Sequence, residues 1–325
     1  MNVLQQAARA ALNGERVLLF TRLPDGLHAA CIGGAWIGHA PCFEIAEALG
    51  KDLRLPATVE TPDGRVVVES FCSMPDAMLV GAGHVASALC AVLSRVGFRV
   101  RVADPRGDLL APARFPGAEE LLLTGYVEAA RSKPPNGSDF FILTPGHDTD
   151  LCALREALRR PHGYVGMLAS RRKASSVREA LRAEGFSEAE LRDVHAPVGL
   201  AIGARTPEEI AVSIAAEVIA WHRVEQGLDE TQPLSLLSQL SQGEGEVLLS
   251  VAERRGSAPR GIGARLLLTK SGQSLGTVGG GIVERRALEA AGLTRVDGAP
   301  RVVRIATGSG EMGCGGEVSV LVERL

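Results

Sequence analysis

The sequence predicts an α/β protein with a doubly wound parallel sheet in the middle of the chain and a smaller α+β domain after it. Three observations predict this fold. Apolar strand-like and helical segments alternate between residues 75 and 225, glycine-rich turns follow several of these strands, and the apolar period changes after residue 234. The 325 residues, 46% of them hydrophobic and 22% charged, are enough for two hydrophobic cores.

The central segment, residues 75–225, is expected to form the parallel sheet. The periodicity predicts, in order, a strand at 77–80, a helix at 85–96, strands at 98–103 and 139–143, a helix at 150–159, a strand at 163–168 and a helix at 171–184. Thr206 and Glu209 have the spacing of a capping box, with Pro207 at the first helical position, and so begin a last helix. The polar stretch 225–233 is expected to be a linker.

A glycine turn joins the first strand of this segment to its first helix. Residues 81–86 have the spacing Gly-x-Gly-x-x-Ala, and Asp104 ends the next strand roughly 20 residues later. This is the Rossmann fingerprint in its usual context. Gly81 allows the tight turn, Gly83 lets a phosphate approach the helix N-terminus, and Asp104 would accept a ribose hydroxyl. The alternative is a Rossmann fold that keeps its packing glycines without the ligand.

Two histidines are expected near this turn. His84 occupies the turn itself, and His147 and Asp148 lie on the loop after the strand at 139–143, at the edge where open α/β sheets bind ligands. Both histidines could reach a shared ligand or a metal. The alternative is a loop histidine and a helix cap by Asp148. Residues 170–173 and 199–205, at two later helix starts, are candidate anion sites for the same reason.

The C-terminal segment, residues 234–325, is expected to form the small α+β domain. Strands are predicted at 245–252, 264–269, 301–306 and 317–323, with an opening helix and a second helix at 282–291. Three motifs lie among them: Arg-Gly-Ser-Ala-Pro-Arg at 255–260, Gly-Thr-Val-Gly-Gly-Gly-Ile-Val-Glu at 276–284 and Gly-Cys-Gly-Gly at 313–316. Together they concentrate backbone amides, two arginines and a thiol, which suits an anionic, sulfur-bearing or phosphorylated ligand.

Several residues of these motifs are candidates for a site. The binding candidates are Arg255, Ser257, Arg260, Gly279, Gly280 and Gly281. The two guanidiniums suit phosphate or carboxylate because each can donate two parallel hydrogen bonds. Glu284 either bonds the ligand, as a catalytic candidate, or caps the helix. The Cys314 thiol, flanked by glycines, is expected to be a persulfide carrier, a soft metal ligand or a redox-sensitive thiol, and the alternative is an inert thiol in a structural turn.

The N-terminal segment, residues 1–74, resembles a degenerate copy of the C-terminal one. Residues 15–20 match 245–250, residues 31–35 match 277–281, and residues 65–69 match 318–323 in their alternation alone. This repeat predicts that the first and last segments pack as a pseudo-symmetric pair, with the Rossmann unit inserted between them. The N-terminal copy lacks the first and third motifs, so any chemistry is expected on the C-terminal copy.

Composition excludes several classes of protein. The net charge is −3 with scattered lysines and arginines, so nucleic acid is not an expected partner. No apolar run approaches the roughly 20 residues of a membrane span, and residues 1–14 have the pattern of a surface helix, which favours a cytoplasmic protein. The six cysteines have neither zinc-site spacing nor the density of a disulfide scaffold, so most, including Cys90 and Cys152, are expected to be reduced core residues.

Taken together, the motifs resemble the XdhC/CoxI family. The resemblance is carried by residues 79–85, 147–148, 163–166, 197–214, 255–260, 276–284 and 313–322, and it covers most of the chain after residue 74. Two features depart from the family pattern. The Arg-Gly-Ser module follows the Rossmann unit, whereas the commoner order places it first, and Ala169 precedes Ser170 where a glycine is expected.

The resemblance implies an accessory protein of molybdenum hydroxylases such as xanthine dehydrogenase. Such a protein binds and protects the molybdenum cofactor, a molybdopterin, promotes exchange of a terminal oxygen for sulfur with a cysteine desulfurase, and delivers the cofactor to the apo-hydroxylase. It would be a cofactor-binding maturation chaperone rather than a turnover enzyme. The residues suit this role because molybdopterin carries a phosphate, a dithiolene and a polar pterin. The module order leaves the client hydroxylase open, and a homodimer is the default expectation.

Two other functions stay open on the residues alone. The Gly81 turn and Asp104 favour an NAD(P)-dependent oxidoreductase, for which His147 and Asp148 are the one candidate pair for hydride transfer. A nucleotide-sensing module that binds without chemistry predicts instead that substituting Cys314 has no effect. A dinucleotide at the Rossmann turn is a further candidate ligand, and no metal is identified.

Overall fold

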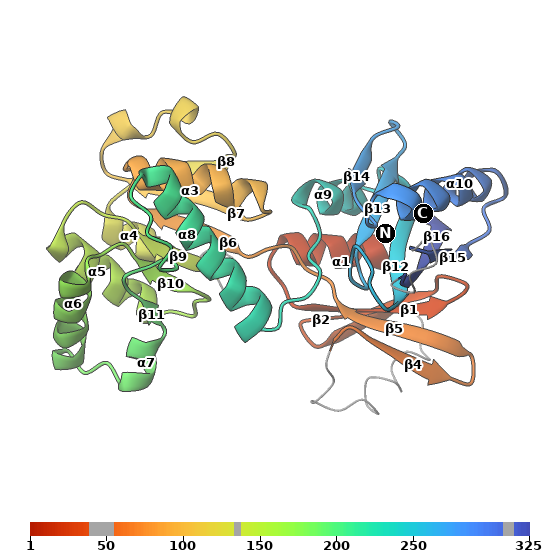
Figure 1. Ribbon diagram of the computed structural model, residues 1–325, viewed down its shortest axis with the longest axis horizontal. Helices are drawn as coiled ribbons and strands as arrows, with labels where there is room; N and C mark the ends of the chain where they lie inside the picture. The colour runs from red at the N-terminus through yellow and green to blue at the C-terminus, as the bar shows by residue number, and fades with distance from the viewer. Residues whose placement is uncertain (39–54, 133–137, 308–314) are drawn as a thin grey trace. The chain divides into compact units, whose positions relative to one another are not determined.

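The computed structural model describes residues 1–38, 55–132, 138–307 and 315–325 (Figure 1). The chain divides into two compact units. Unit 1 combines residues 1–73 with residues 229–325, and unit 2 is the continuous segment 74–228. Among the described residues, unit 2 contains a parallel six-stranded sheet and unit 1 contains two antiparallel five-stranded sheets. The predicted α/β class, a doubly wound sheet with a separate α+β part, is confirmed.

The sheet of unit 2 has the strand order of a dinucleotide-binding fold. Its strands are β6 (Asp76–Val80), β7 (Arg99–Asp104), β8 (Ala118–Leu123), β9 (Asp139–Ile142), β10 (Val165–Met167) and β11 (Val194–His195). Their spatial order is β11-β10-β9-β6-β7-β8, and every neighbouring pair is parallel. Because the order reverses between β6 and β9, the carboxyl ends of these two strands flank the place where such sheets bind ligands.

Helices cover both faces of this sheet (Figure 1). On one face, α3 (His84–Arg95) and α8 (Pro207–Ala220) share a core with strand residues such as Leu79 and Phe141. On the other face, α4 (Tyr126–Arg131), α5 (His147–Leu158) and α6 (Arg171–Ala183) share a core with Met78 and Ile142. Central strands buried on both faces read as continuous apolar runs, which is why the sequence predicted them as strands of a parallel sheet.

Unit 2 also contains elements that the periodicity did not predict. They are the edge strands β8 and β11, the helices α4 and α7 (Glu188–Arg192), the 3₁₀ turns η1 (Gly107–Leu109) and η2 (Pro112–Arg114), and the π-helical turn η3 (Trp221–Glu225) that continues α8. The helix predicted at 150–159 begins earlier, at His147, because Gly146 is its N-cap. His147 and Asp148 therefore lie in the first turn of α5, and the prediction that they lie on a loop is wrong.

Unit 1 contains two sheets of the same topology, β3-β2-β1-β5-β4 and β14-β13-β12-β16-β15. The N-terminal strands are β1 (Val17–Leu23), β2 (His28–Ile32), β3 (Ala35–Gly38), β4 (Ala57–Thr61) and β5 (Gly64–Ser70). The C-terminal strands are β12 (Gly245–Arg255), β13 (Arg265–Thr269), β14 (Ser274–Gly276), β15 (Arg301–Ala306) and β16 (Glu317–Arg324). The predicted packing of the first and last segments against each other is confirmed by their common compact unit.

Among the residues that the structure describes, three helices accompany these sheets (Figure 1). α1 (Val3–Leu12) precedes the first strand of the N-terminal sheet, and α9 (Leu234–Gln242) precedes that of the C-terminal sheet. The two helices pack in one core that includes Leu19 of β1 and Leu248 of β12. α10 (Gly281–Asp297) covers the opposite face of the C-terminal sheet, where it packs on Val247, Leu249 and Val320.

Equivalent positions of the two sheets share one backbone requirement. Gly38 ends β3 and Gly276 ends β14, and each pairs with the second residue of the neighbouring strand. Both have positive φ, 97° and 85°. A Cβ would lie 2.5 Å from the carbonyl oxygen of His28 in one sheet and 2.3 Å from that of Arg265 in the other. Glycine is therefore required at both positions.

This equivalence corrects part of the sequence alignment. Gly33 and Gly34 form the hairpin turn between β2 and β3, whereas Gly279 and Gly280 follow β14. The match of residues 31–35 to 277–281 is therefore wrong. It failed because two adjacent glycines serve equally well in a hairpin turn and in a turn before a helix.

Two polar contacts, one buried and one partly buried, join the sheets reciprocally. His28, the first residue of β2, bonds Glu323 of β16 with 2.8 Å between Nε2 and Oε2. Arg265, the first residue of β13, pairs with Glu69 of β5. The strand register places these two pairs at equivalent positions of the two sheets. Each sheet thus supplies one carboxylate and one basic side chain to the other.

Two further expectations concern the membrane and Cys90. Within the described part of the chain, the helices are all too short or too polar to cross a membrane.

Cys90 is fully buried on α3, and burial raises the pKa of its thiol to about 11. The thiol is therefore protonated at neutral pH. This is the core role that the sequence predicted.

Candidate functional site

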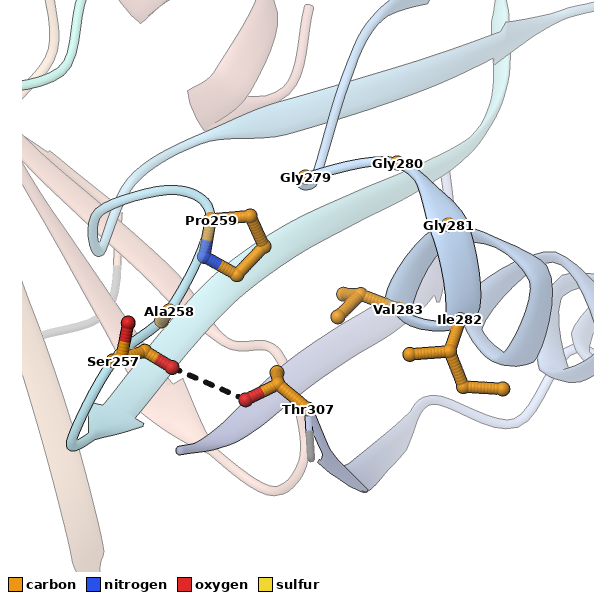
Figure 2. A pocket seen from close by; sticks show the side chains of 9 residues that line it. All are labelled: Ser257, Ala258, Pro259, Gly279, Gly280, Gly281, Ile282, Val283 and Thr307. Atoms are coloured by element: carbon orange, nitrogen blue, oxygen red, sulfur yellow. Dashed lines mark hydrogen bonds between the residues drawn. The ribbon is translucent and has the colours of Figure 1, made fainter. Parts of the chain in front are cut away.

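Two of the C-terminal motifs meet at a pocket of about 390 Å³ in unit 1 (Figure 2). Its walls come from the turn after β12, the glycine turn before α10 and the end of β15. The lining residues are Ser257, Ala258, Pro259, Gly279, Gly280, Gly281, Ile282, Val283 and Thr307. A pocket of this volume can hold a small organic ligand or one end of a larger one.

Glycine is required in the turn before α10 for two different reasons. Gly279 has φ +124°, and a Cβ on it would lie 2.5 Å from Cγ of Pro259. Gly280 and Gly281 also have positive φ, 67° and 53°, but nothing lies within 4 Å of a Cβ on either. Gly279 therefore lets the two turns pack closely, while Gly280 and Gly281 present bare backbone at the pocket.

Glu284 holds this turn in place. Its Oε2 accepts hydrogen bonds from Thr277 Oγ1 at 2.6 Å and from the backbone N–H of Gly280 at 3.3 Å. Thr277 Oγ1 in turn accepts from the backbone N–H of Gly279 at 3.1 Å. Of the two roles that the sequence left open for Glu284, this geometry favours the cap. Glu284 does not line the pocket.

Thr307 connects the turn after β12 to the start of β16, and sequence reasoning missed it. Its hydroxyl lies 3.1 Å from the carbonyl oxygen of Ser257, the contact drawn in Figure 2, and 2.9 Å from that of Gly316. It also accepts from the backbone N–H of Gly316 at 2.9 Å. A threonine at the end of a strand carries no sequence signal of such a role.

The pocket favours an anion. α10 is 17 residues long, and its N-cap residue, Gly280, has no side chain that could accept a hydrogen bond from the first turn. The N–H groups of residues 281–283 have no intrahelical acceptor, and they carry the positive end of the helix dipole. The described residues that line the pocket are all uncharged, and the Glu284 carboxylate, which bonds Thr277 and the Gly280 N–H, is not one of them. A phosphate or carboxylate is the natural ligand of such a helix end.

The remaining candidates of this module lie differently. Arg260 pairs with Glu230 at 2.6 Å, and the backbone N–H of Gly261 donates to the same carboxylate. Arg255 is exposed at the end of β12. Neither guanidinium lines the pocket, so their expected grip on the ligand stays a prediction. Cys314 lies outside the described residues, so the predicted role of its thiol stays a prediction.

The carboxyl edge of the unit 2 sheet holds the second group of candidates. Gly81 has φ +120°, and a Cβ on it would lie 2.4 Å from the carbonyl oxygen of Leu143, so glycine lets the ends of β6 and β9 meet. Gly83 is the N-cap of α3, and nothing lies within 4 Å of its Cβ position. His84 is the exposed first residue of α3, in the helix rather than in the turn as predicted.

Asp104 is engaged inside the protein. Its side chain is fully buried, and Oδ2 accepts from the backbone N–H of Ala82 at 2.8 Å. The Arg106 guanidinium donates to both oxygens, at 2.9 and 2.8 Å, and the Arg106 backbone N–H donates to Oδ1. Because a carboxylate has about four acceptor sites, the ribose hydroxyl predicted for Asp104 finds no open oxygen in this arrangement.

These contacts predict a pH dependence. Burial alone would raise the pKa of Asp104, but the hydrogen bonds from Arg106 and Ala82 outweigh it and hold the pKa below its usual range. A lowered folded-state pKa stabilises unit 2 above the unfolded pKa of about 3.9, and this stability is lost as the pH falls through the folded value.

We therefore expect wild type to lose more stability than Asp104→Asn between about pH 5 and pH 3, since the amide does not titrate. The measurement is urea unfolding of unit 2 at each pH, followed by Trp221 fluorescence in a Trp36→Phe background. The Asn oxygen can still accept from Ala82. Equal losses for the two proteins would contradict this assignment.

The predicted pair, His147 and Asp148, is exposed on α5. The buried residue of the same turn is Asp150, which makes the polar contacts at this helix start. Asp150 is fully buried, accepts from Thr144 Oγ1 at 2.6 Å and pairs with Lys173 of α6. Burial raises the pKa of Asp150, while Lys173 and Thr144 oppose that rise. Among the described residues, no group of three or more His, Cys, Asp or Glu side chains could hold a metal ion.

Known proteins match both parts of the chain. Residues 78–218 match the model described as the XdhC Rossmann domain, and residues 239–306 match the model of the XdhC and CoxI family. Together the two matches span more than half of the chain. They also place the Rossmann domain before the XdhC/CoxI segment, as the motifs indicated.

Two individual proteins illustrate the similarity. The uncharacterized protein YqeB of Escherichia coli K12 is 31% identical over 259 residues, 74% of this chain and 46% of its own length. The molybdenum cofactor insertion chaperone PaoD of the same organism is 31% identical over 113 residues, 32% of this chain and 36% of its own. The chain thus spans about half or less of the length of these relatives.

A solved structure shows the same fold. It is described as a xanthine dehydrogenase from Bacillus halodurans, and it matches with a TM-score of 0.54 at 22% identity, over 71% of this chain and 66% of that one. The two family models and the motifs agree on one assignment. The chain belongs to the XdhC/CoxI family.

Proposed function

We propose that this protein binds the molybdenum cofactor and assists its insertion into a molybdenum hydroxylase of the xanthine dehydrogenase type. The observation that carries the proposal is the pocket of unit 1, which presents the first-turn N–H groups of α10 beside bare glycine backbone. The similarity to a protein named as a molybdenum cofactor insertion chaperone supports it. The role is that of a maturation chaperone in the cytoplasm, in which the cofactor is cargo.

The chemistry of molybdopterin suits this pocket. Its phosphate would accept from the N–H groups of residues 281–283. Its flat, polar pterin could approach the backbone closely, because Gly280 and Gly281 carry no side chains and have open space beyond them. The hydroxyl of Ser257 and the carbonyl groups of the turn would offer polar partners to the pterin.

A sulfuration step is the finer part of this proposal. Cys314 precedes Gly315 and Gly316 in sequence, and Gly316 bonds the pocket residue Thr307. We propose that the Cys314 thiol, loaded as a persulfide by a cysteine desulfurase, supplies the terminal sulfur of the bound cofactor. Two equivalents of an external thiol supply the two electrons that convert the outer persulfide sulfur to the sulfide level and become a disulfide; the displaced terminal oxygen leaves as water, and Cys314 returns to the thiol. We also propose a homodimer as the working assembly.

Substituting Cys314 separates binding from sulfuration. Cys314→Ala is expected to bind the cofactor within about threefold of wild type, but to yield hydroxylase with at least about tenfold less activity, because only the sulfurated cofactor supports turnover. The measurement is the activity of a reconstituted apo-hydroxylase, with cofactor loading quantified in parallel. Full activity after delivery by Cys314→Ala would remove the thiol from the mechanism.

The pocket itself is tested by a charge at Ser257. In Ser257→Asp an added carboxylate faces the place of the anionic cofactor, so the Kd is expected to rise at least about tenfold, which corresponds to 1.4 kcal/mol. Ser257→Asn, of the same shape without the charge, is the matched control and should bind within about threefold of wild type. The exposed position of Ser257 makes both variants compatible with the fold. Equal affinities of the Asp and Asn variants would place the cofactor elsewhere.

A further inference from the structure

We propose that the carboxyl edge of the unit 2 sheet binds a nucleotide whose ribose carries a phosphate monoester, and that Arg106 selects this phosphate. The inference concerns unit 2 alone and does not depend on the cofactor pocket of unit 1. It starts from Asp104, at the end of β7, which is the position where a Rossmann fold reads the ribose of its dinucleotide.

Asp104 serves here as a support for the glycine turn. It accepts the backbone N–H of Ala82, while the carbonyl oxygen of Ala82 accepts from Arg114 Nη2 at 3.2 Å. Arg114 is itself held by a bond of its Nη1 to the carbonyl oxygen of Leu109 at 2.7 Å. Both backbone groups of Ala82, the middle residue of the turn, are therefore hydrogen-bonded: its N–H to Asp104 and its carbonyl oxygen to Arg114.

Because Asp104 is occupied by these bonds, Arg106 is the side chain at this position that could contact the ribose. Its Nε and Nη2 are bound to the buried carboxylate, yet its side chain is 44% exposed. One edge of the guanidinium is therefore fixed, and the N–H groups of Nη1 and the second N–H of Nη2 are available to an anion from outside. A guanidinium fixed in this way loses little conformational entropy on binding.

The donor set decides which ribose is recognised. Arginine has donors and no acceptor, so it cannot accept the proton of a ribose hydroxyl, whereas a phosphate oxygen matches its forked N–H groups. Tyr126 adds a hydroxyl close by, 3.4 Å from both oxygens of Asp104. The position is therefore built for a phosphate on the ribose. Gly83, with open space beyond its Cβ position, leaves room for the diphosphate of the same ligand at the start of α3.

Calorimetric titration of the full-length protein tests this inference. NADP⁺, which carries a 2′-phosphate, is expected to bind at least about tenfold more tightly than NAD⁺, and its advantage should shrink as salt is raised. Adenosine 2′,5′-bisphosphate and adenosine 3′,5′-bisphosphate are titrated beside AMP. The tighter of the two bisphosphates identifies whether the phosphate belongs on the 2′ or the 3′ oxygen, and either one exceeding AMP supports the inference.

Variants assign the preference to Arg106. Arg106→Gln should bring the affinities for NADP⁺ and NAD⁺ within about threefold of each other, and Asp104→Asn/Arg106→Gln should do the same without leaving a buried unpaired charge. Arg131→Gln is the matched control. Arg131 is the last residue of α4, at the end opposite Tyr126, and its substitution removes an equal positive charge from an exposed ion pair with Glu156. It should keep the wild-type preference.

Three results would overturn the inference. They are wild type that prefers neither NADP⁺ over NAD⁺ nor either bisphosphate over AMP, a phosphate preference that survives in the folded double variant, and no binding of any of these nucleotides. Each is distinguishable from failure of the proposed function, because cofactor binding is measured separately through Ser257.

Discussion

Removing the Glu69 carboxylate is expected to destabilise unit 1 by about 3–5 kcal/mol. Glu69 and its partner Arg265 are 5% and 3% exposed. The guanidinium also donates to the carbonyl oxygen of Gly263 at 2.8 Å and lies 4.8 Å above the ring of Phe71. In Glu69→Ala the Arg265 charge stays buried without its carboxylate, and these two weaker contacts do not replace it.

The measurement is the free energy of unfolding in urea, followed by Trp36 fluorescence in a Trp221→Phe background. The protein has two tryptophans, one in each unit, so each unit can be followed separately. Asp25→Ala is the control, because it breaks an exposed ion pair with Arg22 and should cost about 1 kcal/mol or less. Glu69→Leu/Arg265→Met should recover most of the loss by removing both charges. A Glu69→Ala loss no larger than that of the control would refute this account of the sheet interface.

Gly81→Ala is expected to destabilise unit 2 by at least about 3 kcal/mol. The added Cβ would lie 2.4 Å from the carbonyl oxygen of Leu143, a backbone atom that cannot move without shifting β9, and φ is +120°. The loss is measured by urea unfolding followed by Trp221 fluorescence in a Trp36→Phe background. A loss below about 1 kcal/mol would show that β6 and β9 do not meet as described.

Gly83→Ala is the matched comparison at the same turn. Its φ of −71° suits any residue and its Cβ meets nothing, so the free energy of unfolding should stay within about 1 kcal/mol of wild type. The added methyl group nevertheless stands where a phosphate would approach the start of α3, and nucleotide affinity should fall. Equal nucleotide affinities of Gly83→Ala and wild type would argue against a ligand at this turn.

The parallel sheet was predictable because its central strands are continuous apolar runs joined by helices and glycine turns. The missed elements lack that signal. β8 is an edge strand whose Glu119 and Glu120 are exposed, and β11 has two residues. Charged side chains on edge strands are common and conceal the strand in the sequence. The start of α5 was misplaced because Gly146 as N-cap leaves no polar capping side chain to mark the helix.

The candidate site was predictable to the extent that glycines revealed it. Gly279, Gly280 and Gly281 do line a pocket with Ser257. The contacts that shape the pocket come from residues distant in sequence, such as Thr307, and a single sequence carries no information about that pairing. Arg260 shows the same limit, since Glu230, which pairs with it, lies in the segment assigned to a linker. The repeat in unit 1 was visible, but its register required the strand pairing.

Anaerobic equilibrium binding of molybdenum cofactor to the purified protein, with NAD⁺ and NADP⁺ titrated in parallel, distinguishes a cofactor chaperone from an oxidoreductase. We expect the wild-type protein to bind the cofactor and Ser257→Asp to weaken this binding at least about tenfold. Saturating NADP⁺ should change the cofactor Kd by less than about threefold, since the two ligands are expected to occupy different units. Nicotinamide binding without cofactor binding would contradict the account and make the protein an oxidoreductase that carries the motifs of a maturation chaperone.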